Sequence, residues 1–155
     1  MTAHALPGGR ATHIPRPEMR LAGWVSVVFL ALLGLGAVAG GIALVVRPDG
    51  SVMGFDVAIL AGSPFRDFLV PGLILGGLFG LGSLAVAVIG VRRWHVAPFL
   101  AVGIGIGQMI WIPVQLSIIK DLSFFHPTCY AIGLVIATAS YWWGRETFRA
   151  WLAGR

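Results

Sequence analysis

Hydrophobic residues in this chain occur in long runs, and most of the charged residues fall between those runs. Uncharged stretches cover residues 21–46, 68–91 and 96–119, and a shorter one covers 127–143. A helix that crosses a hydrocarbon core of about 30 Å needs about 20 apolar residues. The spacing therefore predicts an all-α membrane protein, a bundle of four transmembrane helices near 21–46, 64–91, 96–119 and 127–143.

Composition supports a chain that is solvated by lipid. Hydrophobic residues make up 57% of the sequence and charged residues only 11%, which is far from the balance of a water-soluble domain. The 22 glycines would break helices in water, but they are tolerated inside a bilayer, where the backbone keeps its own hydrogen bonds. The basic residues flank the runs and form no continuous face, so the net charge of +5 does not indicate nucleic-acid binding.

The basic residues also predict an orientation, because Lys and Arg near helix ends stay on the cytoplasmic side. One side would carry eight of them: Arg10, Arg16, Arg20, Arg92, Arg93, Arg145, Arg149 and Arg155. The other side would carry three: Arg47, Arg66 and Lys120. We therefore expect a multi-pass protein of the inner (plasma) membrane with cytoplasmic termini, a disordered tail over 1–20 and a basic tail over 145–155. A cleaved signal peptide ending near Ala39 stays an alternative for the first run.

The first loop on the outer side should contain regular structure of its own. It opens with the turn-forming sequence Pro48-Asp49-Gly50-Ser51. The mostly apolar residues 53–61 then predict a short helix on the outer membrane surface. Ser63 followed by Pro64 predicts an N-cap and the first residue of the second span.

Small residues spaced four apart predict where helices approach closely, since packing in lipid depends on such contacts. They occur in every predicted span, with Gly133 and Ala137 in the fourth and these glycines in the others: Gly36, Gly40, Gly72, Gly76, Gly80, Gly103 and Gly107. Packing within one bundle and packing between copies of the chain are both consistent with this pattern.

Chemically reactive groups are scarce inside the predicted spans. The uncharged runs that form most of these spans, 21–46, 68–91, 96–119 and 127–143, contain no Asp, Glu, Lys, Arg or His, which disfavours proton-coupled transport and haem ligation between helices. The only cysteine, Cys129, has no disulfide partner, and its pairing with His126 is the one candidate for a nucleophile and base. Adding Asp121 gives no standard metal-site spacing. We therefore expect no catalytic residue, no metal and no cofactor.

Two sets of residues could nevertheless bind a ligand. Gln108, Trp111 and Gln115 follow helical spacing in the third span and form a polar stripe. The topology would gather a mixed-charge cluster on the outer face: Asp56, Arg66, Asp67, Lys120, Asp121 and His126. Interhelical hydrogen bonding by the glutamines and a solvated rim of charges are the purely structural interpretations.

Several short motifs resemble those of a family of small four-helix bacterial integral membrane proteins that is distantly similar to DoxX. They are Arg47-Pro48-Asp49-Gly50-Ser51, Ser63-Pro64-Phe65 and Trp111-Ile112 with Gln115, and the resemblance covers residues 24–143. It implies architecture only. The sequence favours a non-enzymatic scaffold or accessory subunit of an envelope complex, with a membrane-protein partner or a second copy of the chain. A small-molecule or lipid-binding permease component is the alternative, and an accessory subunit of a membrane oxidoreductase ranks third.

Overall fold

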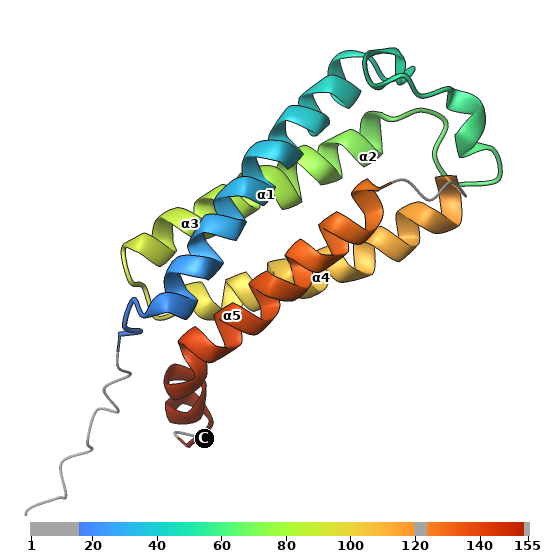
Figure 1. The fold of residues 1–155 in the computed structure, drawn as a ribbon. Helices are drawn as coiled ribbons and strands as arrows, with labels where there is room; N and C mark the ends of the chain where they lie inside the picture. The colour runs from blue at the N-terminus through green and yellow to red at the C-terminus, as the bar shows by residue number, and fades with distance from the viewer. Residues whose placement is uncertain (1–15, 120–123, 154–155) are drawn as a thin grey trace, which may run out of the picture.

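The computed structural model describes residues 16–119 and 124–153, and in these residues all regular structure is helical. The predicted disordered tail covers residues 1–20, and residues 1–15 of it lie outside the described residues. Four long helical rods run side by side, and the second of them consists of three consecutive helical segments over residues 69–91 (Figure 1). In chain order the elements are α1 Leu21–Val46, η1 Ser51–Met53, η2 Val57–Leu60, α2 Leu69–Leu73, η3 Ile74–Leu81, α3 Gly82–Val91, α4 Ala97–Ile119 and α5 Phe125–Ala153.

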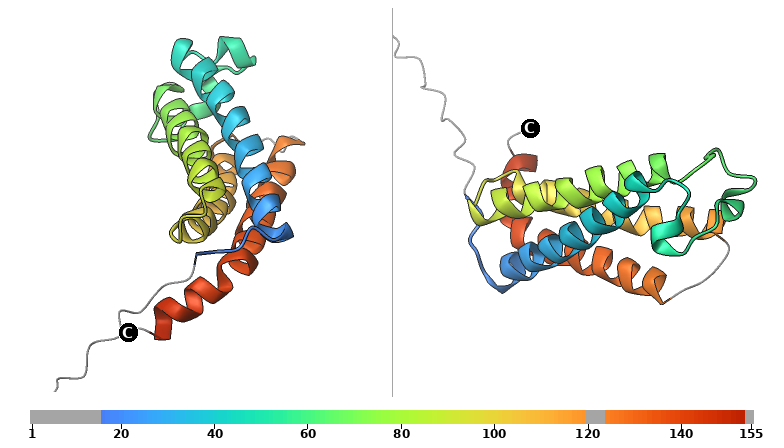
Figure 2. Two further views of the ribbon diagram at one scale, coloured as in Figure 1. Left: turned by 90° about the vertical axis from the view of Figure 1, so that its left-hand side faces the viewer. Right: turned by 90° about the horizontal axis from the view of Figure 1, so that it is seen from above.

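The rods alternate in direction, so the molecule has two distinct ends (Figures 1 and 2). We call the end where α1 begins and α5 finishes the terminal end. The opposite end carries the connection from α1 to α2, residues 47–68, and is called the loop end. α1 packs along η3 and α3, α4 packs along α5, and α1 also contacts α5.

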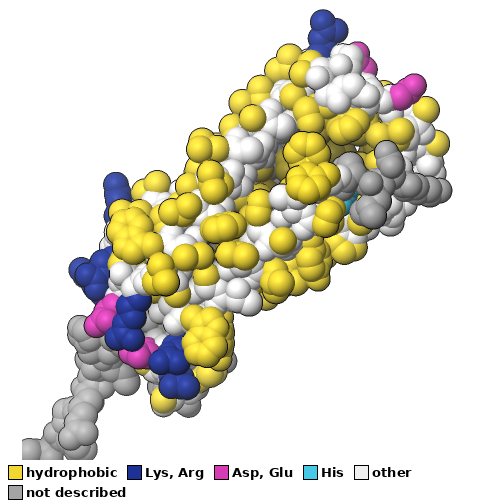
Figure 3. All heavy atoms as spheres, in the orientation of Figure 1, with side chains coloured by type: hydrophobic (Ala, Val, Ile, Leu, Met, Phe, Trp, Pro, Cys, Tyr) yellow, Lys and Arg dark blue, Asp and Glu magenta, His cyan; other side chains and the backbone are white. Residues whose placement is uncertain are grey.

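Three of the rods have the length and apolar composition needed to cross a membrane. They are Leu21–Val46, Leu69–Val91 and Ala97–Ile119. Large side chains such as Leu35 and Ile110, each 62% exposed, point away from the bundle. Hydrophobic side chains cover the middle of the face drawn in Figure 3, whereas Lys and Arg lie toward its ends and gather at the terminal end. These features identify a membrane protein, because such a surface is stable in lipid and not in water.

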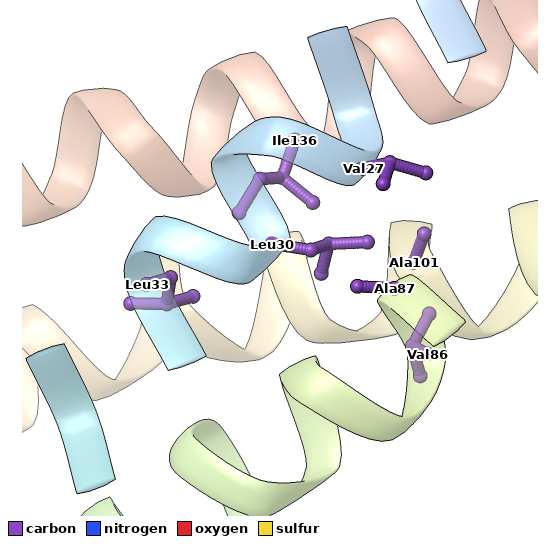
Figure 4. Packing of buried hydrophobic residues seen from close by; sticks show 7 residues of the cluster. All are labelled: Val27, Leu30, Leu33, Val86, Ala87, Ala101 and Ile136. Atoms are coloured by element: carbon purple, nitrogen blue, oxygen red, sulfur yellow. The ribbon is translucent and has the colours of Figure 1, made fainter. Parts of the chain in front are cut away.

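The main hydrophobic core lies between α1, α3, α4 and α5 (Figure 4). Leu30 and Ile136 are fully buried at its centre, and Ala101 allows α4 to come close. Next to this core, the hydroxyl groups of Ser26 in α1 and Ser140 in α5 share a buried hydrogen bond of 2.6 Å. A direct polar contact of this kind satisfies both groups where no water can reach them.

The glycine ridge of the second rod faces α1 within the same chain. A Cβ placed at Gly72 would lie 2.8 Å from the Cβ of Leu44, and one at Gly80 would lie 2.7 Å from Cγ2 of Val38. Between them, a Cβ at Gly76 would lie 3.2 Å from the Cα of Gly41. The ridge therefore packs inside the bundle and is not available to a second copy.

The other predicted packing glycines divide into two groups. Gly40 lies against Leu75 and Gly107 lies against Phe79, with Cβ positions 3.3 and 3.5 Å from those side chains. Gly36 and Gly103 have nothing within 4 Å of a Cβ position. The close contact between α4 and α5 uses Gly105 instead, because a Cβ there would lie 2.7 Å from the carbonyl oxygen of Gly133.

The second rod begins five residues later than the sequence suggested, at Leu69 and not at Pro64. Ser63 does not cap it; the Ser63 hydroxyl instead accepts a hydrogen bond from the Phe65 N–H at 3.2 Å, which closes a local turn. The carboxylate of Asp67 accepts from the Leu69 N–H at 2.9 Å just before the helix, whose N-cap residue, Phe68, makes no side-chain capping bond. Residues 63–68 thus remain in the loop, where Phe68 is buried.

The single surface helix predicted over residues 53–61 is replaced by two 3₁₀ turns, η1 and η2. Gly54 separates them with a positive φ of 70°, which a continuous helix cannot contain. The Asp56 side chain starts η2 by accepting from the Ala58 N–H at 2.8 Å. Local side-chain capping and glycine geometry therefore divide the segment.

The middle of the second rod is a π-helix, which is rare and wider than an α-helix. It contains Gly76, Gly77 and Gly80, and it ends where the Gly82 N–H donates to the carbonyl of Gly77. Adjacent residues of the π-helix contact different helices. Gly80 lies against Val38 of α1. The buried ring of Phe79 lies 5.9 Å from the ring of Trp111 in α4.

Candidate functional site

An apolar pocket of about 50 Å³ lies at the loop end, between the loop and three of the rods. The loop supplies aromatic side chains, and α1, the second rod and α4 supply the rest of the wall. The lining residues are Leu44, Phe55, Leu60, Phe65, Phe68, Pro71, Leu75, Trp111, Val114, Gln115, Ile118 and Ile119. We call this the loop-end pocket.

The loop wall of the pocket is held in place by backbone hydrogen bonds and aromatic packing. The Phe68 N–H donates to the carbonyl of Pro48 at 2.9 Å, which ties the two ends of the loop together. The rings of Phe55 and Phe68 lie 5.7 Å apart. Phe68, Leu44 and Leu60 are buried together as a small core beneath the loop. The loop is therefore a packed cover over the end of the bundle.

Gly50 is the residue around which this cover folds. It has a positive φ of 80°, and a Cβ there would lie 2.8 Å from the Phe68 ring and 2.9 Å from the carbonyl oxygen of Phe55. Beside it, the Asp49 carboxylate accepts from the N–H and hydroxyl of Ser51 at 3.0 and 2.7 Å. The backbone N–H of Ser51, followed by its hydroxyl, lowers the pKa of Asp49, so the turn keeps its charged acceptor in mildly acidic solution.

Trp111 is the main polar group in the wall of the loop-end pocket. Its indole nitrogen, Nε1, is buried and has no hydrogen-bond partner among the described residues. An unsatisfied buried donor costs about 1–3 kcal/mol, so native proteins seldom leave one without a purpose. Because Trp111 lines the pocket, an acceptor atom that reached its Nε1 atom would recover this energy.

The structure separates the three residues of the predicted polar stripe. Gln115 lines the loop-end pocket with Trp111, whereas Gln108 does not. Gln108 is only 2% exposed and lies against α5. A Cβ placed at Gly133 of that helix would be 3.1 Å from the Cβ of Gln108. Its Oε1 atom is buried with no partner among the described residues. The close approach of α5 covers Gln108, while the loop aromatics surround the level of Gln115.

The predicted mixed-charge cluster is only partly described. Asp56 caps η2, Asp67 accepts from the N–H of Leu69 at the start of α2, and Arg66 is exposed. His126 is buried in the first turn of α5 and interacts with its surroundings. Lys120 and Asp121 lie outside the described residues. The two aspartates therefore stabilise the loop and the start of α2 through hydrogen bonds to the backbone.

His126 and Cys129, which the sequence offered as a base and a nucleophile and as metal ligands, both lie in α5. Residues 16–119 and 124–153 contain no group of three or more His, Cys, Asp or Glu side chains that could hold a metal ion. Cys129 is a free, half-buried thiol in α5, three positions after His126. The proposed involvement of Asp121 falls outside the described residues.

Sequence reasoning found Trp111 and Gln115 but missed most of the pocket wall. Phe55, Leu60 and Phe68 come from a loop whose folding back over the bundle has no periodic signal. The turn sequence at residues 48–51 was the available clue, because it reverses the chain directly after α1. Comparison of the chain with protein-family models, with curated proteins and with solved structures gives no match. The resemblance to small four-helix bacterial membrane proteins accordingly stays a prediction.

Proposed function

We propose that this chain crosses the inner membrane four times, with both termini in the cytoplasm, and binds a chain-like amphipathic molecule in the loop-end pocket. The ligand class is a lipid or a lipid-like small molecule that carries a hydrogen-bond acceptor. The observation that carries the proposal is the buried, unpartnered indole N–H of Trp111 in the wall of an apolar pocket.

The fourth crossing is supported by the course of α5. This helix has 29 residues, long enough for about 43 Å of rise, and it packs beside α4 and α1. Its uncharged part, residues 127–143, lies next to helices that have the composition of membrane spans. Arg145 and Arg149 follow at the terminal end, together with Arg20 of the N-terminal segment. The concentration of Arg at this end favours a cytoplasmic position for it.

Cysteine labelling tests the four-span arrangement. In a Cys129→Ala background, Ser51→Cys places one thiol in the loop and Ala153→Cys places one at the end of α5. We expect a membrane-impermeant maleimide to label Ser51→Cys in intact spheroplasts and Ala153→Cys only after permeabilisation. Labelling of both positions in intact spheroplasts would mean that α5 does not return to the cytoplasm, and it would contradict the topology.

The loop-end pocket suits a narrow, mostly apolar ligand. A cavity of about 50 Å³ exceeds the requirement of one water, about 10–15 Å³, but is much smaller than typical drug-sized sites. Its wall is aromatic and aliphatic except for Trp111 and Gln115. Part of an alkyl chain could occupy such a space while an ester or carboxyl oxygen accepts from the indole. The ligand's acceptor would then satisfy the buried indole N–H, and the ligand would displace no charged group.

Trp111→Phe tests this assignment, because it removes the N–H and retains an aromatic ring. With dodecanoic acid as the probe, we expect wild-type protein in detergent to bind it and the variant to bind it about tenfold more weakly, for a loss of about 1.4 kcal/mol. Isothermal calorimetry in a steroid-based detergent, which has no alkyl chain to compete, measures the change.

Trp24→Phe provides the control for Trp111→Phe. Trp24 is 51% exposed at the terminal end and does not line the pocket, so its substitution should leave the affinity for dodecanoic acid within twofold. Equal affinities for the wild type and Trp111→Phe would show that the indole N–H does not bind this ligand.

The scaffold and oxidoreductase-accessory hypotheses remain predictions. For either of them, a partner helix could approach the open faces around Gly36 and Gly103.

A further inference from the structure

A second cavity, of about 150 Å³, lies at the terminal end of the molecule. It lies between the segment that precedes α1, the first turn of α1 and residues 142–147 of α5. Three arginine residues line it, Arg16, Arg20 and Arg145. The two carboxylates in the lining are Glu18 and Glu146, and Glu18 is already paired with Arg20 at 2.9 Å. The cavity therefore has an excess of positive charge.

The start of α1 adds hydrogen-bond donors to the same place. No described side chain caps this helix, and its first turn contains no acidic residue. The N–H groups of Gly23 and Trp24 both donate to the carbonyl of Arg20, and within residues 16–119 and 124–153 those of Leu21 and Ala22 have no backbone acceptor. Free N–H groups and the helix dipole make such a terminus attractive to anions. Ala22 is part of the cavity lining.

Trp143 supplies an independent indication of a missing acceptor. Its side chain lines the cavity and is only 7% exposed, yet its Nε1 atom has no hydrogen-bond partner among the described residues. That nitrogen borders the first turn of α1, since a Cβ at Gly23 would lie 3.0 Å from it. The Met19 thioether lies beside the same position, 3.3 Å from the Cβ site, and its flexible side chain can move aside. Thr147, 3% exposed, lies in the same wall.

We propose that the terminal-end cavity binds a phosphate group. Guanidinium groups, free helix N–H groups and an indole N–H are all donors, and oxygen atoms of a phosphate could accept from several of them at once. The volume admits a polyatomic anion, because one water needs only about 10–15 Å³. The described residues of the cavity offer the buried indole no acceptor of their own, and residues 1–15 contain no Asp or Glu that could supply a carboxylate.

The phosphate can come from a lipid headgroup or from a soluble anion, and the two sources share this chemistry. Under the proposed topology, the terminal end lies at the cytoplasmic leaflet, where anionic lipids attract basic residues. A phosphatidic acid headgroup presents the phosphate directly. The choline of phosphatidylcholine places a cation in front of it, which Arg16 and Arg145 would repel.

Native mass spectrometry of the full chain in detergent tests the proposal, with phosphatidic acid and phosphatidylcholine of matched chains as probes. We expect phosphatidic acid to bind at least tenfold more tightly than phosphatidylcholine. Trp143→Phe should lower the affinity for phosphatidic acid about tenfold and leave that for phosphatidylcholine unchanged. Trp94→Phe is the control, because Trp94 is 52% exposed and does not line the cavity.

Arg145→Gln keeps the test valid even if Trp143→Phe weakens the fold. Arg149→Gln is its matched control, since Arg149 lies one turn further along α5, carries the same charge and does not line the cavity. Loss of phosphatidic acid binding in Arg145→Gln alone supports a built site. Equal loss in both variants would indicate a diffuse charge effect and overturn the proposal, as would equal binding of the two lipids by the wild type.

Inorganic phosphate separates the two sources. If inorganic phosphate at millimolar concentration binds the wild type, and binds Arg145→Gln more weakly than Arg149→Gln, the site takes a soluble phosphate. If phosphatidic acid remains bound in the presence of inorganic phosphate, the headgroup is the ligand. Both results support a phosphate site, whereas failure of both probes to depend on Arg145 or Trp143 would overturn it.

Discussion

Gly41→Ala should destabilise the protein strongly, with a loss of about 1–3 kcal/mol or more in the free energy of unfolding. Gly41 is the point where α1 and the π-helix η3 approach most closely. An added Cβ would collide with the Cα of Gly76, and would lie 2.6 Å from its backbone nitrogen and 2.9 Å from the carbonyl oxygen of Gly72. All three obstacles are backbone atoms. They cannot move aside as a flexible side chain could, so the two rods have to separate.

Gly36→Ala is the matched control for Gly41→Ala. Gly36 lies in the same helix, and nothing lies within 4 Å of a Cβ placed there. Alanine should therefore leave stability unchanged or raise it slightly, because glycine is the poorer helix former by about 0.5–1 kcal/mol. Unfolding in mixed micelles with increasing dodecyl sulfate, followed by circular dichroism, compares the two variants. Equal stabilities would show that α1 and η3 do not pack through Gly41.

The packing partners of the glycines show how far a sequence can be interpreted without coordinates. Spacing alone identified Gly72, Gly76 and Gly80 as one face of a helix, because a four-residue repeat places residues on one side. It could not identify Gly41, the residue that the ridge meets. That choice depends on the rotation and crossing of two helices, which side-chain shapes decide together. In α4, the same limit led to Gly103 and Gly107, whereas Gly105 is the residue that contacts α5.

Helix ends were predictable where charge and lipid define them. The bounds of α1, Leu21–Val46, match the prediction because charged residues flank the run on both sides. The start of the second rod was misplaced because Ser63 followed by Pro64 has the sequence of a helix start, whereas the Ser63 hydroxyl closes a local turn in the loop. The same residue pair suits both structures, and the sequence alone does not distinguish them. Composition does not predict the π-helix. This glycine-rich segment packs between α1 and α4, and its wider geometry depends on that packing.

The candidate pocket was predictable only in its helical part. Trp111 and Gln115 were visible as polar groups in an apolar span, where any polar side chain is conspicuous. Gln108 looked equivalent by spacing, but the approach of Gly133 encloses it against α5. The difference between a pocket residue and a buried one therefore depends on the neighbouring helix at each level. That information is tertiary and is absent from the pattern of a single helix.

Gly50→Ala should disrupt the loop that covers the pocket, and Gly54→Ala is designed to separate two causes of that effect. Both glycines have positive φ, 80° and 70°, so alanine costs about 1–2 kcal/mol of backbone strain at either position. Only at Gly50 would the new Cβ also meet the Phe68 ring, at 2.8 Å, and the Phe55 carbonyl oxygen, at 2.9 Å. At Gly54 nothing lies within 4 Å. Crowding should therefore add about 1–3 kcal/mol to the cost at Gly50 alone.

Tryptic cleavage after Arg66 measures this difference, because Arg66 is exposed in the loop and becomes a better substrate when the loop opens. We expect Gly50→Ala to be cleaved at least fivefold faster than Gly54→Ala, which corresponds to about 1 kcal/mol of additional loop opening. Displacing Phe68 also removes part of the pocket wall, so dodecanoic acid should bind Gly50→Ala more weakly than Gly54→Ala. Equal cleavage rates would mean that Phe55 and Phe68 do not pack over Gly50, and the loop-end pocket would then lose its cover.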